Sequence, residues 1–125
     1  MKGTGSHQIA DTIAGRDILL VTVDTLRADH VGIYGYSRDT TPNLDRFFAE
    51  GTVFEASYAS TSYTPATVVS ILSGLLPQEH GVRVFFELLS PDVVLIGDLL
   101  PPEYQTAAFV SNGVLTDEAV GLGAR

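Results

Sequence analysis

The chain has 125 residues, of which 45% are hydrophobic, and a formal net charge of −8. This length and apolar content suffice for one ordinary core and exclude a disordered chain. The seven basic residues exclude a nucleic-acid partner, because phosphate binding needs clustered Lys and Arg, and the absence of cysteine excludes disulfides, thiolate metal sites and a cysteine nucleophile.

The sequence predicts neither a membrane segment nor a signal peptide. Residues 56–78 carry no charge, but they contain two prolines and many Ser and Thr. The first eight residues lack the apolar stretch of a signal peptide. We therefore expect a cytoplasmic protein for the chain as given, and an exported one if the natural start lies upstream. The oligomeric state is left open.

In chain order, residues 1–16 form a lead-in with little periodicity, and residues 17–125 form the candidate domain. Residues 18–23 are a run of Leu and β-branched residues that predicts a strand covered on both faces. Asp24 follows that strand, and residues 25–41 are rich in turn formers.

Two helices are predicted by the same signals. Thr41-Pro42 is typical of an N-cap with its first helical residue, and Gly51 is placed to end that helix. Thr64-Pro65 opens the second and clearer helix, which Gly74 and Pro77 close. Its apolar stripe consists of Val68, Ile71, Leu72 and Leu75.

Strands are also predicted over residues 53–58 and 104–110, with a third helix over 92–100 between them. Alternating strands and helices indicate an α/β fold with a mostly parallel sheet and flanking helices. Three strands are few for such a sheet, and residues 115–125 suggest no closing element. We therefore expect an incomplete part of a larger domain.

Asp24 is the first candidate site residue. An Asp after a strand can cap a turn through its own backbone. It can also be a metal ligand, because α/β enzymes gather ligands at the carboxyl ends of strands and an unpaired carboxylate there is costly. A hard or borderline divalent cation would satisfy it, with oxygen ligands from other loops.

Thr64 is the second candidate, and it too has two interpretations. Thr before Pro at a helix start is an ordinary N-cap. The same place offers free backbone N–H groups and positive potential, which favour an anionic ester. A metal ion could further activate the hydroxyl as a nucleophile.

The remaining polar candidates favour structural roles. His30 is expected to form hydrogen bonds within its loop, and His80 to pack or cap after a helix. Neither has a partner at zinc-finger or metalloprotease spacing. Arg27 and Arg38 either steer an anionic substrate or are solvated. For Asn112, a left-handed turn is favoured over donation to a substrate oxyanion.

These residues together resemble the start of the sulfatase family, which belongs to the alkaline-phosphatase-like superfamily of metal-dependent ester hydrolases. The resemblance begins with Val21-Thr-Val-Asp24-Thr-Leu-Arg27-Ala-Asp-His30-Val-Gly32-Ile-Tyr34-Gly35-Tyr36 and Thr40-Thr41-Pro42-Asn43-Leu44-Asp45. It continues in Ser73-Gly74-Leu75-Leu76-Pro77-Gln-Glu-His80-Gly81-Val82 and in residues 104–112. In order, these pieces extend from about residue 17 to residue 123.

The resemblance implies that Thr64 is the nucleophile, since the family places it ten residues before the glycine matching Gly74. In sulfatases proper that residue is a Cys or Ser converted to formylglycine, followed by Pro and Arg at the positions of Ala66 and Val68. Relatives that cleave or transfer phosphate esters use an unmodified Thr. A phosphodiesterase or phosphotransferase is therefore the alternative to a sulfatase.

The resemblance also implies a divalent metal ion held by Asp24 and Thr64: Ca²⁺ in a sulfatase, Zn²⁺ or Mn²⁺ in a phosphodiesterase. Three family groups are replaced, a second Asp by Thr25 and a sulfate-binding Lys and His by Ser111 and Gly113. The partner is a small anionic ester. A different class remains open, a non-catalytic truncated remnant or interaction module, and we expect the 125-residue chain alone to be inactive.

Overall fold

The computed structural model describes residues 15–122, which belong to two compact units. Of the described residues, unit 1 comprises 15–19 and 59–122, and unit 2 comprises 20–58. The predicted lead-in over residues 1–16 lies outside the described residues except for its last two positions.

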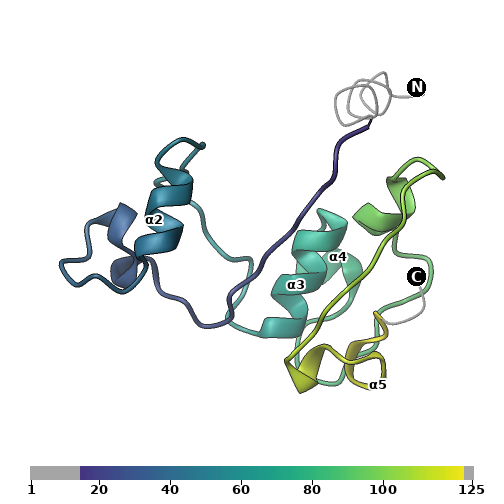
Figure 1. Ribbon diagram of the computed structural model, residues 1–125. Helices are drawn as coiled ribbons and strands as arrows, with labels where there is room; N and C mark the ends of the chain where they lie inside the picture. Colours follow the sequence, from purple (N-terminus) through teal and green to yellow (C-terminus); the bar gives the residue numbers. More distant parts are fainter. Residues whose placement is uncertain (1–14, 123–125) are drawn as a thin grey trace. The chain divides into compact units, whose positions relative to one another are not determined.

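Short helices make up the regular structure of both units (Figure 1). Unit 2 contains the 3₁₀ turns η1 (Ala28–His30) and η2 (Gly32–Tyr34) and the helix α2 (Pro42–Phe48). Unit 1 contains α3 (Thr64–Ser73), α4 (Pro77–His80), η3 (Ile96–Leu99), η4 (Gly113–Leu115) and α5 (Asp117–Val120). Among these described helices, none has the length and apolar character needed to cross a membrane.

The two helices predicted from their start and stop signals are confirmed. Helix α2 has Thr41 as its N-cap residue and Pro42 at its first position, but it ends at Phe48 with Ala49 as its C-cap, before the predicted Gly51. Helix α3 has proline in its first turn and ends at Gly74, whose φ of 71° places it in the left-handed region. Glycine adopts that conformation without a steric penalty, which is why it ends helices so often.

Three predictions around these helices were wrong in detail. Pro77 does not merely follow α3 but begins α4, where its fixed φ suits the first helical position. Residues 92–100 form only the 3₁₀ turn η3, at whose start the Asp98 carboxylate accepts a hydrogen bond of 2.8 Å from the Leu95 N–H. Residues 115–125 do contain an element, α5.

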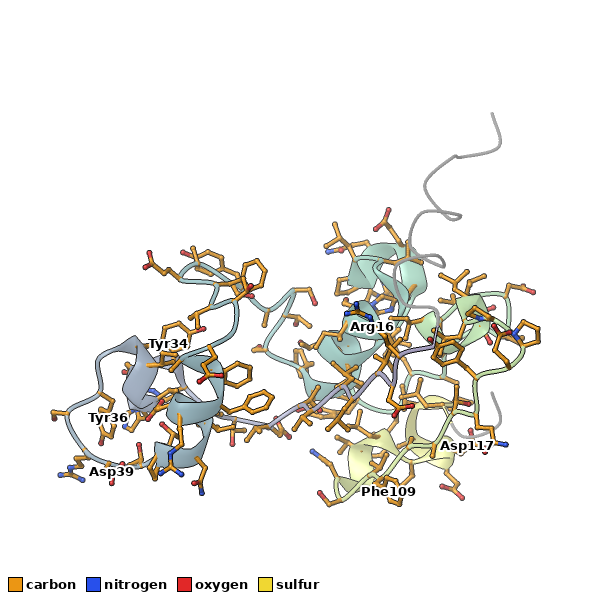
Figure 2. The ribbon with its side chains drawn as sticks, turned by 45° about the horizontal axis from the view of Figure 1, so that its top comes forward. Arg16, Tyr34, Tyr36, Asp39, Phe109 and Asp117 are labelled. Carbon is orange, nitrogen blue, oxygen red and sulfur yellow. The ribbon has the colours of Figure 1, made fainter. Side chains whose placement is uncertain are left out.

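The predicted strands are not formed within residues 15–122. Residues 18–23, 53–58 and 104–110 carry no strand assignment, and the expected sheet is therefore not seen in this part of the chain. Large apolar side chains in these segments are exposed, among them Leu19 at 87% and Phe109 at 99%. Phe109 is labelled in Figure 2. Parallel strands need hydrogen-bonding neighbours distant in sequence, and none pairs with these segments here.

The core lies in unit 1 and positions α3. It consists of Val69, Val82, Leu89, Leu95 and Val120, with Leu72, Val93 and Leu122 packed against it. A hydrogen bond of 3.0 Å from the Leu89 N–H to the Val120 carbonyl ties the segment before η3 to the end of α5. Helix α3 thus has one side anchored in the only core cluster of the described residues.

Candidate functional site

Thr64 is the first residue of α3. The N-cap position belongs to Tyr63, which has the extended backbone of such a residue, with φ −96° and ψ 122°. The prediction that Thr64 is the N-cap was therefore wrong by one residue. Thr64 is half-buried and shares the first turn with Pro65, so its hydroxyl group lies at the N-terminal end of α3.

The segment that leads into Thr64 is fixed by two contacts. The Thr67 hydroxyl donates a hydrogen bond of 2.8 Å to the Thr61 carbonyl, which holds the loop against the first turn of α3. The Tyr63 ring packs edge-on against Phe85, with ring centroids 5.2 Å apart and planes at 77°. These contacts restrain the backbone on the N-terminal side of the candidate nucleophile.

The helix behind Thr64 is buried on one side. Pro65, Ala66 and Val69 are buried, and the last two are fully inaccessible. A buried helix start is rigid, because it cannot shift without opening the core. An anion placed before it meets backbone N–H groups and the positive end of the helix dipole.

His80 joins α4 to α3. Its side chain is buried, its Nε2 lies 3.0 Å from the Ser70 hydroxyl oxygen, and its Nδ1 accepts a hydrogen bond of 3.1 Å from the Val82 N–H. Burial lowers the pKa of this imidazole, while hydrogen bonding to the backbone of Ala66 and His80 and the charge of Glu79 act in the opposite direction. The prediction of a packing role for His80 is confirmed.

Asp24 lies in unit 2, directly after the extended segment 18–23, and it is exposed. The next residue, Thr25, has a φ of 58°, a left-handed backbone that is rare for a β-branched residue. Such strain persists only where the surroundings enforce it, and it often marks functional positions. The unusual turn therefore lies immediately beside the candidate metal ligand.

Asp29 organises the loop that follows, which sequence reasoning missed. The Arg27 guanidinium binds both its carboxylate oxygens, at 2.9 and 2.6 Å, and the His30 Nδ1 lies 2.9 Å from one of them. These partners hold the pKa of the Asp29 carboxyl well below its usual range. His30 also packs on Tyr36, with centroids 4.7 Å apart. Arg27 thus forms an ion pair with Asp29. The prediction that His30 forms hydrogen bonds within its loop is confirmed.

A second network in unit 2 was also missed. The Thr41 hydroxyl oxygen accepts a hydrogen bond of 2.9 Å from the Gly32 N–H and donates to the Asp45 carboxylate, which itself accepts 2.8 Å from the Ile33 N–H. We call Thr41 and Asp45 the α2 clasp, because they tie η2 to the start of α2. The spacing of Thr and Asp four residues apart across a helix start is the signal that could have revealed it.

Asn112 does not adopt the left-handed turn that was predicted. Its φ is −106°, and its side-chain oxygen accepts a hydrogen bond of 3.1 Å from the Val114 N–H, so it caps η4. A capping bond needs an extended rather than a left-handed backbone, which explains the difference. The neighbouring positions Ser111 and Gly113 flank this cap.

The two predicted metal ligands belong to different units, Asp24 to unit 2 and Thr64 to unit 1. Within residues 15–122, no three His, Cys, Asp or Glu side chains come together in a way that could hold a metal ion. The residues described here therefore do not fit a divalent cation as a complete donor set. The role of Asp24 as a metal ligand stays a prediction.

Comparisons with known proteins agree on a family. The Sulfatase family model matches residues 16–118. An arylsulfatase of Clostridium perfringens is 39% identical over 71 residues, which cover 57% of this chain and 15% of that enzyme. The dog N-acetylgalactosamine-6-sulfatase is 37% identical over 65 residues, covering 52% of this chain and 12% of the relative.

Bovine arylsulfatase A is 36% identical over 66 residues, or 53% of this chain and 13% of its own length. The matched part thus spans about an eighth to a seventh of these curated relatives. No solved structure matches the chain significantly.

Proposed function

Because this chain belongs to the sulfatase family, we propose that it forms the N-terminal part of a hydrolase that acts on a small anionic sulfate or phosphate ester, with Thr64 as the nucleophile. The single observation that carries this proposal is the place of Thr64. It is the first residue of a buried, ten-residue helix and stands ten residues before the glycine that ends that helix.

The chemistry proposed for Thr64 is in-line displacement. Its hydroxyl group gives its proton to solvent, and its oxygen forms a bond to sulfur or phosphorus while the bond to the leaving oxygen breaks and that oxygen takes up a proton from solvent. Water then hydrolyses the covalent threonine ester, which restores the Thr64 hydroxyl group and releases the sulfate or phosphate product. The backbone N–H groups at the start of α3 stabilise the negative charge that develops on the non-bridging oxygens. The restrained loop before Tyr63 keeps the attacking oxygen in one position, which reduces the entropy lost on reaction.

A phosphate ester is the second candidate substrate, and the identity of residue 64 favours it. Threonine cannot become formylglycine, the group that the resemblance assigns to sulfatases proper. The positions of the family's sulfate-binding Lys and His hold Ser111 and Gly113, and the structure engages Asn112 between them as a cap. A phosphodiesterase or phosphotransferase needs none of these groups.

We also propose a sheet and a metal ligand from membership of the family. The family implies an alkaline-phosphatase-like α/β fold, in which residues 18–23 and 104–110 would be strands of a mostly parallel sheet. Sulfatases depend in general on a divalent metal ion, which supplies Lewis-acid stabilisation of the reacting ester. We assign Asp24 as one ligand of that ion, with Ca²⁺ expected for a sulfatase and Zn²⁺ or Mn²⁺ for a phosphodiesterase.

The test is substitution of Thr64 in the complete gene product. Thr64→Ala should abolish turnover and leave the thermal unfolding midpoint nearly unchanged, whereas Thr64→Ser should retain part of the activity because it keeps a hydroxyl. Ser62→Ala, an exposed hydroxyl loss two residues away, is the matched control and should behave as wild type. Unchanged turnover in Thr64→Ala would disprove the assignment.

Substrate class is tested by comparing a nitrophenyl sulfate with a nitrophenyl phosphate diester. Faster turnover of the sulfate identifies a sulfatase, and faster turnover of the diester identifies a phosphodiesterase. Turnover of neither by correctly folded protein would instead support a non-catalytic module.

A further inference from the structure

His80 is the one buried polar residue among the described residues, and its hydrogen bonds determine where its proton resides. The Val82 N–H can only donate, so Nδ1 accepts and carries no hydrogen. The neutral ring therefore has its hydrogen on Nε2, which points to the Ser70 hydroxyl at 3.0 Å. Nδ1 thus binds the chain after α4, and Nε2 binds α3.

In this tautomer His80 donates a hydrogen bond to α3 through Nε2 and accepts one from its own loop through Nδ1. Its acceptor side fixes the ring to Val82, two residues along its own chain, and its donor side holds a residue in the middle of α3. The residue that the imidazole holds, Ser70, lies in the same helix as Thr64.

Apolar packing alone fixes the rotation of α3 about its axis less firmly than a hydrogen bond does. Ala66, Val69 and Leu72 hold one side of α3 by dispersion contacts, which carry no directional preference. A hydrogen bond is directional and weakens steeply when its angle changes. Ser70 lies six residues after Thr64, about 9 Å along the axis, and any rotation of α3 there is transmitted to Thr64.

We infer that His80 is a positioning residue for Thr64: through its Nε2–H it fixes the rotation of α3 and thereby the direction of the Thr64 hydroxyl. This inference rests on the proposed function of Thr64. Its role is carried by the hydrogen bond to Ser70 in α3.

Two substitutions of His80 each remove one of its two hydrogen bonds, to Val82 or to Ser70. His80→Gln keeps an N–H group at the place of Nε2 and loses the acceptor for Val82. His80→Asn keeps an acceptor at the place of Nδ1 and loses the donor toward Ser70. Each variant loses one of the two hydrogen bonds of the buried ring.

In the complete gene product, assayed with a nitrophenyl phosphate diester and a nitrophenyl sulfate, we expect different kinetics from the two variants. His80→Asn should lower kcat about 10- to 100-fold with KM within about twofold, because misplacement of the attacking atom affects the reaction more than binding. His80→Gln should keep kcat within about threefold. Equal losses in the two variants, or losses that match the unfolded fraction, would overturn the inference.

A second measurement does not depend on turnover. The Thr67 amide donates to the Tyr63 carbonyl at 2.9 Å, and its hydrogen exchange reports the order of the first turn of α3. We expect exchange about tenfold faster in His80→Asn than in His80→Gln. Equal exchange in the two variants contradicts the inference even if neither ester is turned over.

If His80→Asn does not fold, Ser70→Ala tests whether the hydrogen bond from His80 to α3 positions Thr64. It removes the acceptor on α3 without disturbing the imidazole, and it should lower kcat and accelerate Thr67 exchange in the same direction. Wild-type values would count against His80 as a positioning residue. Full turnover in Thr64→Ala would instead refute the proposed nucleophile, while the exchange difference between His80→Asn and His80→Gln would remain.

Discussion

The carboxylate of Asp45 occupies the space that a side chain at Gly32 would need. A Cβ atom built on Gly32 would lie 2.8 Å from the Asp45 carboxyl carbon, closer than real Cβ atoms approach other atoms. The same carboxylate accepts the Ile33 N–H at 2.8 Å, so it cannot move away without losing that hydrogen bond. Glycine at position 32 is required by the α2 clasp, not by its own backbone angles.

The first prediction follows from this contact. Gly32→Ala should destabilise the protein by about 1–3 kcal/mol, because the clash must be relieved by displacing Asp45 from its two partners. Chemical denaturation measures the change in the free energy of unfolding. Gly97→Ala is the matched control, since a Cβ there meets no atom within 4 Å, and it should change stability by less than about 0.5 kcal/mol.

The second prediction concerns the strained backbone beside Asp24. Thr25→Asn should raise the free energy of unfolding by about 0.5–1 kcal/mol, because Asn tolerates a φ of 58° far better than a β-branched residue. Thr25→Val keeps the branching and the strain, and it should bring no gain. Equal stability of the two variants in thermal unfolding would show that the backbone at this turn is not under strain.

The third prediction is a pH dependence. Because burial holds the pKa of His80 in the folded protein below its ordinary value of about 6.5, the unfolded chain binds a proton that the folded chain does not. Stability should therefore be full above about pH 6.5 and fall as the pH decreases toward the lowered pKa. Glu79, whose charge favours protonation of the ring, reduces the effect without reversing it.

Measurement of the unfolding midpoint between pH 7 and 5 checks this dependence. His80→Gln removes the titrating group and should flatten the profile over that range. The lowered pKa values of Asp29 and Glu87 cause a separate loss of stability at lower pH, below the ordinary carboxyl range. A wild-type profile as flat as that of His80→Gln would contradict the prediction.

Local signals were enough to place the helices of the candidate site. Proline after threonine begins α2 and α3, and a left-handed Gly74 ends α3, because these preferences depend only on neighbouring residues. The strands over residues 18–23 and 104–110 were inferred from composition. Strand pairing depends on distant partners, and within residues 15–122 none forms.

The hydrogen-bond networks could not be predicted from the sequence for a different reason. The α2 clasp joins Gly32 to Thr41, nine residues apart, and His80 meets Ser70 across the turn between two helices. Such pairs depend on how the loops fold back, which no periodicity encodes. The family pattern predicts Thr64 as the nucleophile from its distance to Gly74. It predicts Asp24 as a metal ligand without predicting the other ligands.

The exposed segment from Ile18 to Val23 has a consequence for handling the protein. It contains Ile-Leu-Leu-Val-Thr-Val, without a charge or a proline, and its large apolar side chains are at least half exposed. Uncharged β-branched stretches of this length stack into cross-β fibrils when their backbone edges are open. Whenever this stretch is left uncovered, during synthesis or in a shortened product, self-association competes with folding.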